Sequence, residues 1–297
     1  MKLLILLVSL VDSLLVVSWN VENFLDPKED STGRYTAKRL QAKCSGIAKT
    51  IFLIADKEGR LPDAVALMEV GNRRVLDKLL TTTALRKLDY AIIHYDSPDR
   101  RGIDCALLYR KSRLTLLRSG PRHLHDSTGA ILRTRDILLA EFEGIDILVN
   151  HHPSKVGADS ERRRAIAMQR MWGLIDSLSA AGHPRIISVG DFNDNVWPAP
   201  DAPCSSAQDR SAQGSRTPGT IKYNGAWEKI DGHFARGSLT VTETVFDHPT
   251  LTEPDRTFGG TKPRRTFSGP RYLAGLSDHY PLLFLVSPSP DSSLRSE

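Results

Sequence analysis

Carboxylate, amide and imidazole side chains recur along this chain in five short motifs. In order they are SWNVEN (18–23), LMEV (67–70), NHHPS (150–154), GDFND (190–194) and SDHYP (277–281). Four of them lie within or directly after an apolar run, and the third ends one. Strand ends are rigid positions from which such groups can converge on one point. The motifs therefore predict one site that binds a cation and transfers protons.

The acidic members of these motifs are Glu22, Glu69, Asp191 and Asp278. An unpaired charge beside an apolar strand is costly. A hard divalent cation removes that cost, because Mg²⁺ accepts a few carboxylates and keeps several waters. Any one of these acids taken alone is equally explained by a cap or a salt bridge. Their joint occurrence favours a metal site.

The imidazoles are candidates for proton transfer near neutral pH. His279 follows an aspartate, and His151 ends an apolar run. His152 is expected to face the other way, because neighbouring strand residues alternate sides. Asp104 is a candidate for orienting His151. The alternative for each histidine is a structural role in the core.

Two basic residues are candidates for binding phosphate oxygens, Arg101 and Lys155. The alternative for each is a solvated charge at the rim. The clusters 162–164 and 262–265 are also basic, and we expect them to be solvated faces.

Apolar periodicity predicts the elements that carry these residues. Strands are expected at 14–18, 64–68, 90–94, 104–109, 114–118, 137–142, 145–149, 185–189, 239–246 and 282–286. Helices are expected from a Thr36 cap to about residue 55, at 72–88 and at 160–180. Glu143-Gly144 indicates a hairpin. Because strands occur both in hairpins and between helices, the sheets should be mixed.

The chain has 297 residues, a net charge of +5 and a pI near 9.1. The motifs span the sequence and no linker divides it, so we expect one domain at 13–286 and a flexible tail at 287–297. Residues 195–220 are expected to form a long surface loop. The basic charge favours acidic partners, although a mildly basic protein without that preference is the alternative. Cys44, Cys105 and Cys204 show no zinc spacing, and Cys105 is expected in the core.

Residues 1–12 resemble a signal peptide, but Asp12 interrupts the apolar run and no A-x-A site follows. Export and a cytoplasmic location both stay open. The run is too short to span a membrane as a helix.

The motif order resembles the endonuclease/exonuclease/phosphatase superfamily, which includes pancreatic deoxyribonuclease, apurinic endonucleases and inositol-polyphosphate phosphatases. The likeness is closest to the bacterial branch that carries only the superfamily's name. It runs from about residue 14 to 286 and includes RGIDCALLY (101–109), KYNG (222–225) and RTFSG (265–269). The resemblance implies an α/β four-layer sandwich, in which two packed mixed sheets are flanked by helices.

The resemblance also implies a role for each matching residue. Glu69 matches the main metal ligand, Glu22 and Asp278 match further metal-side carboxylates, and many members have Asp where Glu22 stands. The expected metal is Mg²⁺ or Mn²⁺. The remaining matches are His279 as the catalytic imidazole, Asp231 as its orienting acid, Asp191 and Asn193 as the pair that positions water, His151 at the scissile phosphate, and Asn20 and Asn150 on the substrate side.

These assignments predict a divalent-metal-dependent phosphoesterase. The leading expectation is a nuclease, more specifically an endonuclease acting on DNA or RNA. One alternative is a phosphatase or phosphodiesterase acting on a phosphorylated sugar, inositol or lipid headgroup. The other is a catalytically silent binding protein on the same fold. We expect a monomer without a stable protein partner.

Overall fold

The computed structural model describes residues 13–30, 32–157, 159–194 and 217–289. The signal-like segment 1–12, most of the expected loop 195–220 and residues 290–297 of the expected tail lie outside the described residues. Within them, no helix is long and apolar enough to cross a membrane.

Most of the strands form two large sheets. The first has the order β12 (Leu239–Val245), β17 (Leu282–Pro288), β1 (Leu14–Phe24), β2 (Ala64–Val70), β4 (Asp104–Arg110) and β3 (Tyr90–His94). The second has the order β11 (Asp231–Gly237), β8 (Arg185–Asp191), β7 (Ile145–His151), β6 (Ile137–Phe142) and β5 (Leu116–Arg122). Each contains one parallel pair, β1 with β2 and β7 with β8, among antiparallel pairs. The expectation of mixed sheets is confirmed.

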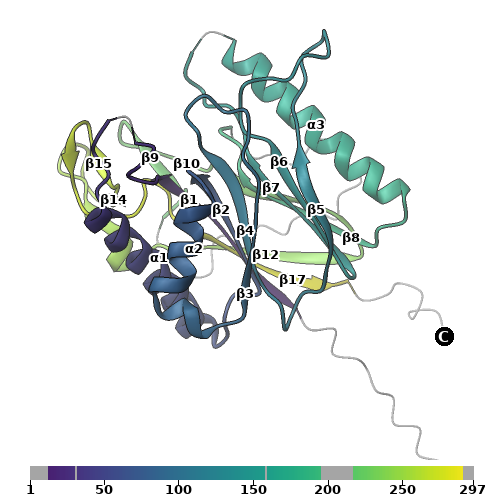
Figure 1. Ribbon diagram of the computed structural model, residues 1–297, viewed down its shortest axis with the longest axis horizontal. Helices are drawn as coiled ribbons and strands as arrows, with labels where there is room; N and C mark the ends of the chain where they lie inside the picture. Colours follow the sequence, from purple (N-terminus) through teal and green to yellow (C-terminus); the bar gives the residue numbers. More distant parts are fainter. Residues whose placement is uncertain (1–12, 31, 158, 195–216, 290–297) are drawn as a thin grey trace, which may run out of the picture.

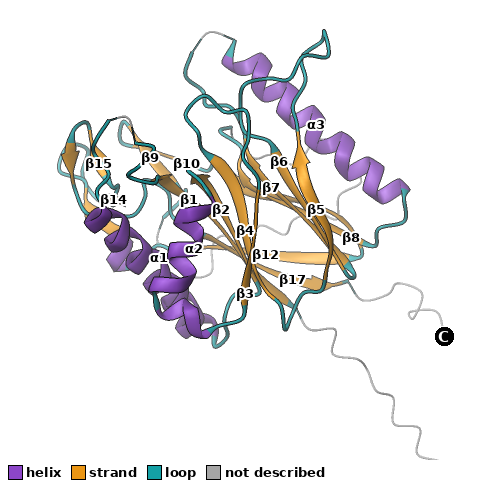
Figure 2. Ribbon diagram, in the orientation of Figure 1, coloured by secondary structure: helices purple, strands orange, loops and turns teal. Residues whose placement is uncertain are grey.

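Three helices cover the outer faces of the sheets. Helices α1 (Ala37–Glu58) and α2 (Arg73–Thr82) lie on the first sheet, and α3 (Ser160–Ala180) lies on the second (Figures 1 and 2). Thr36 caps α1 by accepting a hydrogen bond from the amide of Arg39, as predicted. Asn72 caps α2 in the same way. The result is the predicted four-layer α/β sandwich.

The main core fills the space between the two sheets and continues under α1 and α2. A second core lies between α3 and the outer face of the second sheet. The central strands β2 and β7 are buried along their whole length, which explains the apolar runs 64–68 and 147–149 within them. Cys105 is buried in the first core, as predicted.

Several predicted boundaries were wrong. The helix expected at 72–88 ends at Thr82, and a 3₁₀ turn, η1 (Ala84–Lys87), follows because the Thr83 hydroxyl accepts from the amide of Leu85. The strand expected at 114–118 is β5, which begins at Leu116 and runs to Arg122. Residues 287 and 288, expected in the tail, belong to β17, which pairs with β12 as far as Pro288.

Three short hairpins were not predicted as strands. They are β9 (Ile221–Tyr223) with β10 (Ala226–Glu228), β13 (Thr252–Pro254) with β14 (Thr261–Pro263), and β15 (Phe267–Ser268) with β16 (Arg271–Tyr272). A 3₁₀ turn, η2 (Pro249–Leu251), precedes β13. These hairpins are too short to show periodicity in the sequence.

Candidate active site

Two neighbouring bulges direct glutamates away from the regular pleat. The pairing of β1 with β2 shifts between Asn20 and Phe24, and that of β2 with β4 shifts between Met68 and Val70. Glu22 (φ 44°) and Glu69 (φ 64°) lie in these bulges with left-handed backbones. Such backbones cost roughly 1–3 kcal/mol each for residues other than glycine, and they gather at functional sites.

The two bulges are joined by a hydrogen bond. The amide of Asn23 donates to Glu69 Oε2 at 2.7 Å, and Asn23 is itself left-handed with φ 48°. Because β1 and β2 are parallel, both bulges lie at the same end of the sheet. Glu22 and Glu69 are thereby held near each other, with 6% and 9% of their surfaces exposed.

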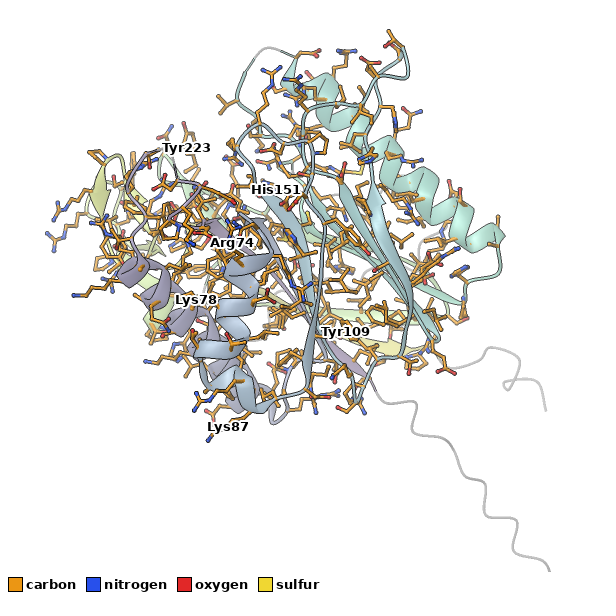
Figure 3. The ribbon with its side chains drawn as sticks, viewed as in Figure 1. Arg74, Lys78, Lys87, Tyr109, His151 and Tyr223 are labelled. Carbon is orange, nitrogen blue, oxygen red and sulfur yellow. The ribbon has the colours of Figure 1, made fainter. Side chains whose placement is uncertain are left out.

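The second sheet aligns three more candidate site residues in one row. His151 pairs in register with Asp191, and Asp191 pairs with Asp231 across β7, β8 and β11. In Figure 3 the labelled His151 marks the upper end of the sheets, and Tyr109 lies at the opposite end. Gly190, beside this row, is required because a Cβ there would lie 2.0 Å from the Asn150 carbonyl oxygen.

His279 lies against this row and is fixed on several sides. Its Nδ1 is 2.8 Å from Asp231 Oδ2, the hydrogen bond that the resemblance implied. Its backbone amide donates to the Ser277 hydroxyl, which donates to the carbonyl of Asn20. Trp19 Nε1 donates to the His279 carbonyl at 3.0 Å. With Nδ1 directed at Asp231, the other ring nitrogen Nε2 lies 3.9 Å from Asp191 Oδ2.

We call His151, Asp191, Asp231 and His279 the histidine cluster, and Glu22, Glu69 and Asp278 the acidic cluster. Asn20 links them: its amide nitrogen donates to Asp191 Oδ2 at 3.0 Å, and its amide oxygen accepts from the backbone of Glu22 at 3.0 Å. His151 Nε2 also lies between them, 3.7 Å from Asp191 Oδ2 and 3.9 Å from Glu69 Oε1.

The pKa values of the two histidines in the histidine cluster are shifted in opposite directions. Burial alone would lower the pKa of His279, but the carboxylates of Asp231 and Asp191 outweigh it and raise that pKa well above its usual value. Burial, with the positive charges of Arg135 and Arg101, lowers the pKa of His151 well below its usual value. These shifts favour the imidazolium form of His279 and the neutral form of His151 at neutral pH.

The pKa of Asp191 lies close to neutral pH. Burial and then the charge of Asp231 raise its pKa to about 7, against the opposing effects of His279 and of the hydrogen bond from Asn20. A carboxyl group in this range can both accept and return a proton at physiological pH.

Each member of the acidic cluster has a cation near it. Arg101 Nη2 is 3.1 Å from Glu69 Oε1. Arg265 bridges the other two, with its Nε 3.3 Å from Glu22 Oε1 and its Nη2 2.8 Å from Asp278 Oδ2. Burial and then the charge of Asp278 raise the pKa of Glu22 despite the opposing charge of Arg265.

The donor atoms of the acidic cluster are of the type that a hard divalent cation binds. They are carboxylate oxygens, which suit Mg²⁺ and Mn²⁺. Part of the rise in the pKa of Glu22 comes from the charge of Asp278, so these two acids repel each other. The structure does not bring ligand atoms of all three acids within 4.8 Å of one another, as it does for Asp191, Asp231 and His279, whose imidazole nitrogen Nδ1 is bonded to Asp231.

Asn193 and Lys155 lie at the edge of these clusters. Asn193 is left-handed (φ 52°), and its amide side chain donates to the carbonyl of His152 at 2.9 Å while its backbone donates to Asp191 Oδ1. Lys155 is paired with Glu228 of the β9–β10 hairpin. The same hairpin touches the site, because Ile221 forms an isolated bridge with His279.

Two expectations for side-chain direction differ from the structure. The Asn150 amide donates to Ser188 Oγ at 2.7 Å, on the face of the sheet opposite His151, because adjacent strand residues alternate sides. Asn150 is therefore not brought to the clusters. Asp104 does not orient His151: it lies 3.2 Å from His94 Nε2 on the neighbouring strand and accepts from the amide of Ser97. His152 does face away from His151, onto Phe192.

Sequence reasoning missed two cations at the site, Arg265 and Lys43. Arg265 lies in a basic run that we expected to be a solvated face. Lys43 lies on the apolar face of α1 between Leu40 and Ile47, and it is buried. A lysine on an otherwise apolar helix face was the available signal, since lysine is seldom fully buried without a partner.

Comparisons with known proteins agree with this architecture. The model of the endonuclease/exonuclease/phosphatase family matches residues 15–287. No curated protein matches the chain. Similar solved structures include an endonuclease/exonuclease/phosphatase from Bacteroides vulgatus, with 19% identity, a TM-score of 0.58, and 94% of this chain and 100% of that chain covered.

Two other similar structures carry more specific descriptions. D. rerio TDP2 complexed with single strand DNA product has 16% identity and a TM-score of 0.58, with 93% of this chain and 99% of that chain covered. A mannosyl-6-phosphatase from Bacteroides thetaiotaomicron has 16% identity and a TM-score of 0.58, with 93% and 100% covered. At these identities the likeness shows the fold.

Proposed function

Since the chain belongs to the endonuclease/exonuclease/phosphatase family, a family of phosphoester hydrolases, we propose that it hydrolyses phosphodiesters with a divalent metal ion and acts as a nuclease. One observation carries this proposal. The Asp231–His279 pair and Asp191 lie beside the acidic cluster at one end of both sheets, joined to it through Asn20. Water attack on an anionic phosphodiester needs both a proton acceptor and concentrated positive charge.

The acidic cluster is the proposed metal site. Glu69, Glu22 and Asp278 would hold Mg²⁺ or Mn²⁺, which when bound supplies positive charge to the phosphate oxygens. Arg101, already within 3.1 Å of Glu69, is positioned to contact a phosphate oxygen when it leaves that carboxylate.

The histidine cluster is the proposed proton-transfer site. Asp191, with its pKa near 7, accepts a proton from the attacking water, and Asn193 helps to place that water. Asp231 holds His279 as an imidazolium whose Nε2 faces the phosphate and stabilises its developing charge. His151, neutral and next to both clusters, contacts a phosphate oxygen through Nε2.

The choice of a nuclease rests on charge and on a structural relative. The net charge of +5 favours a polyanion, and the D. rerio TDP2 structure holds a single strand DNA product. A sugar phosphatase is the second candidate, favoured by the likeness to the Bacteroides mannosyl-6-phosphatase.

A panel of substrates separates these candidates. The purified chain is incubated with Mg²⁺, Mn²⁺ or EDTA and given bis(4-nitrophenyl) phosphate, plasmid DNA, single-stranded DNA, RNA, a phosphoinositide or mannose 6-phosphate. A nuclease cleaves the nucleic acids, and its affinity for them falls steeply with salt. Release of phosphate from mannose 6-phosphate with little salt dependence would favour the phosphatase. No metal-dependent hydrolysis of any substrate would refute the proposal.

A further inference from the structure

Lys43 is a buried ammonium group on the apolar face of α1. Only 4% of its surface is exposed, and its neighbours Leu40, Cys44 and Ile47 are core residues. Burying an ammonium group is costly unless hydrogen bonds and opposite charge compensate it. The groups that compensate Lys43 therefore indicate why the fold retains it.

Its two hydrogen-bond partners belong to the surroundings of Glu22. Lys43 Nζ donates to the backbone carbonyl of Glu22 and, at 2.9 Å, to Thr266 Oγ1. Thr266 in turn donates its backbone amide to Glu22 Oε2 at 2.6 Å. Lys43 thus holds the backbone of Glu22 directly and its carboxylate through Thr266. These contacts tie α1 to the two ends of the chain, β1 and the segment before β15.

The backbone that Lys43 holds is a strained one. Glu22 and Asn23 are consecutive left-handed residues, and the backbone amide of Asn23 donates a hydrogen bond to Glu69 Oε2. The conformation of this turn therefore also positions the Glu69 side chain. Without a partner for the Glu22 carbonyl, relaxation toward regular strand would move both glutamates of the acidic cluster.

Lys43 also differs from the arginines of the site because its side chain is enclosed and cannot move into solvent. The side chains of Arg101 and Arg265 are about half exposed (52% and 46%), so both can swing into solvent when another cation takes their place. Lys43 is enclosed, and it remains close to Glu22, Glu69 and Asp278.

We propose that Lys43 is a positioning residue for the metal site: its enclosed ammonium group holds the left-handed Glu22–Asn23 turn in the conformation that binds the divalent ion. Lys43 neither binds the ion nor touches the phosphate. The inference rests on the proposed function, because it takes the acidic cluster as the place where the ion binds.

Lys43→Met tests this inference, since methionine fills a similar volume and removes the charge and all three donors. The matched control is Lys49→Met, which changes an exposed lysine of the same helix. Mn²⁺ binding to each protein, free of substrate, is measured by calorimetry or by electron paramagnetic resonance. The Kd of Lys43→Met should rise roughly 10- to 100-fold, as for other residues that orient metal ligands. Lys49→Met should bind like the wild type.

Activity gives a second readout. With Lys43→Met, the Mn²⁺ concentration needed for half-maximal hydrolysis should rise by the same factor, and saturating Mn²⁺ should restore most of the rate. A merely structural lysine would instead lower the melting temperature and leave the Mn²⁺ affinity of the folded protein unchanged. That result would overturn the inference.

Thr266→Val decides the question if Lys43→Met does not fold. It removes one acceptor of Lys43 and should weaken Mn²⁺ binding about fivefold, the size of one hydrogen bond; an unchanged Kd in the folded variant would overturn the inference. Failure of the proposed function has a different signature, because the wild-type protein itself would then bind no Mn²⁺.

Discussion

The histidine cluster and the acidic cluster meet at one end of the molecule, yet they are held in different ways. His279 and Asp231 have side chains only 6% and 2% exposed, and they are fixed by a direct hydrogen bond. The acidic cluster instead relies on bulged, left-handed backbone and on Arg101 and Arg265, whose side chains are about half exposed.

This difference indicates which chemical role each cluster can perform. Proton transfer needs groups held in one geometry, and register across three paired strands supplies it. An ion that binds reversibly needs carboxylates whose present arginine partners can move away. Exposed ion pairs contribute only about 0.2–1 kcal/mol of stability, so little free energy is lost when they do. Changes to the histidine cluster should therefore affect the rate, and changes to the acidic cluster should affect metal affinity.

Asp191→Asn should give the largest effect. It removes the proton acceptor while keeping the shape, so we expect kcat to fall by a factor on the order of 10² to 10⁴. The melting temperature should stay the same or rise, because Asp191 and Asp231 are like charges directly opposite each other. Steady-state kinetics, calorimetric Mn²⁺ titration and thermal unfolding measure the three quantities. A large loss of Mn²⁺ affinity would break the division between the clusters.

Glu69→Gln should show the opposite pattern. The amide keeps the shape but removes the charge at the end of β2, so the Kd for Mn²⁺ should rise roughly tenfold or more. Saturating Mn²⁺ should recover part of the rate. The same titration with Glu29→Gln, an exposed acid paired with Arg74, is the control and should show no change. If Glu69→Gln retained the wild-type Kd and rate, Glu69 would not be a ligand.

Asp231→Ala and Asp278→Ala sharpen the comparison when measured in parallel. Loss of the Asp231 carboxylate should lower the rate by about 10- to 100-fold and leave Mn²⁺ affinity almost intact. The pKa of His279 should fall, because the carboxylate that raises it is gone. The limb of the pH–rate profile that reports deprotonation of His279 should then move to lower pH. Asp278→Ala should also weaken Mn²⁺ binding. An equal loss of Mn²⁺ affinity in both variants would refute this assignment.

Arg265→Met should give the smallest effect, and it should change Mn²⁺ affinity in the direction opposite to Glu69→Gln. Arg265 occupies the carboxylates that the ion needs, so its removal should tighten Mn²⁺ binding by a few-fold, in line with a partly exposed ion pair. Substrate affinity should fall if the arginine contacts phosphate. Calorimetric titration in the absence of substrate isolates the first effect. Weaker Mn²⁺ binding would show that Arg265 supports the site instead of competing with the ion.

Much of the fold could be predicted from local patterns. The caps at Thr36 and Asn72, the Glu143–Gly144 hairpin and the long apolar runs all depend on neighbouring residues, which the sequence displays directly. The short hairpins and the left-handed residues Glu22 and Glu69 could not be predicted, because a two- or three-residue strand has no period and a bulge depends on the paired strand.

The candidate site divides in the same way. The motifs alone determined which residue types are available at the strand ends. The alternation of side chains along β7 correctly predicted that His152 faces away from His151. Applied to Asn150, the same alternation would have excluded it from the site. The resemblance to a known family, and no local pattern, supplied Asp231 as the partner of His279.

By itself, the sequence determined the element types, the apolar faces and the identity of the carboxylates and imidazoles, because these depend on residue chemistry and short periods. Only the tertiary structure decided which charges meet. Arg265 reaches Glu22 across more than two hundred residues, and Lys43 reaches it from a helix. Asp104 was drawn to His94 instead of His151. Such pairings depend on the distance between groups in the folded chain, and no spacing along the chain encodes that distance.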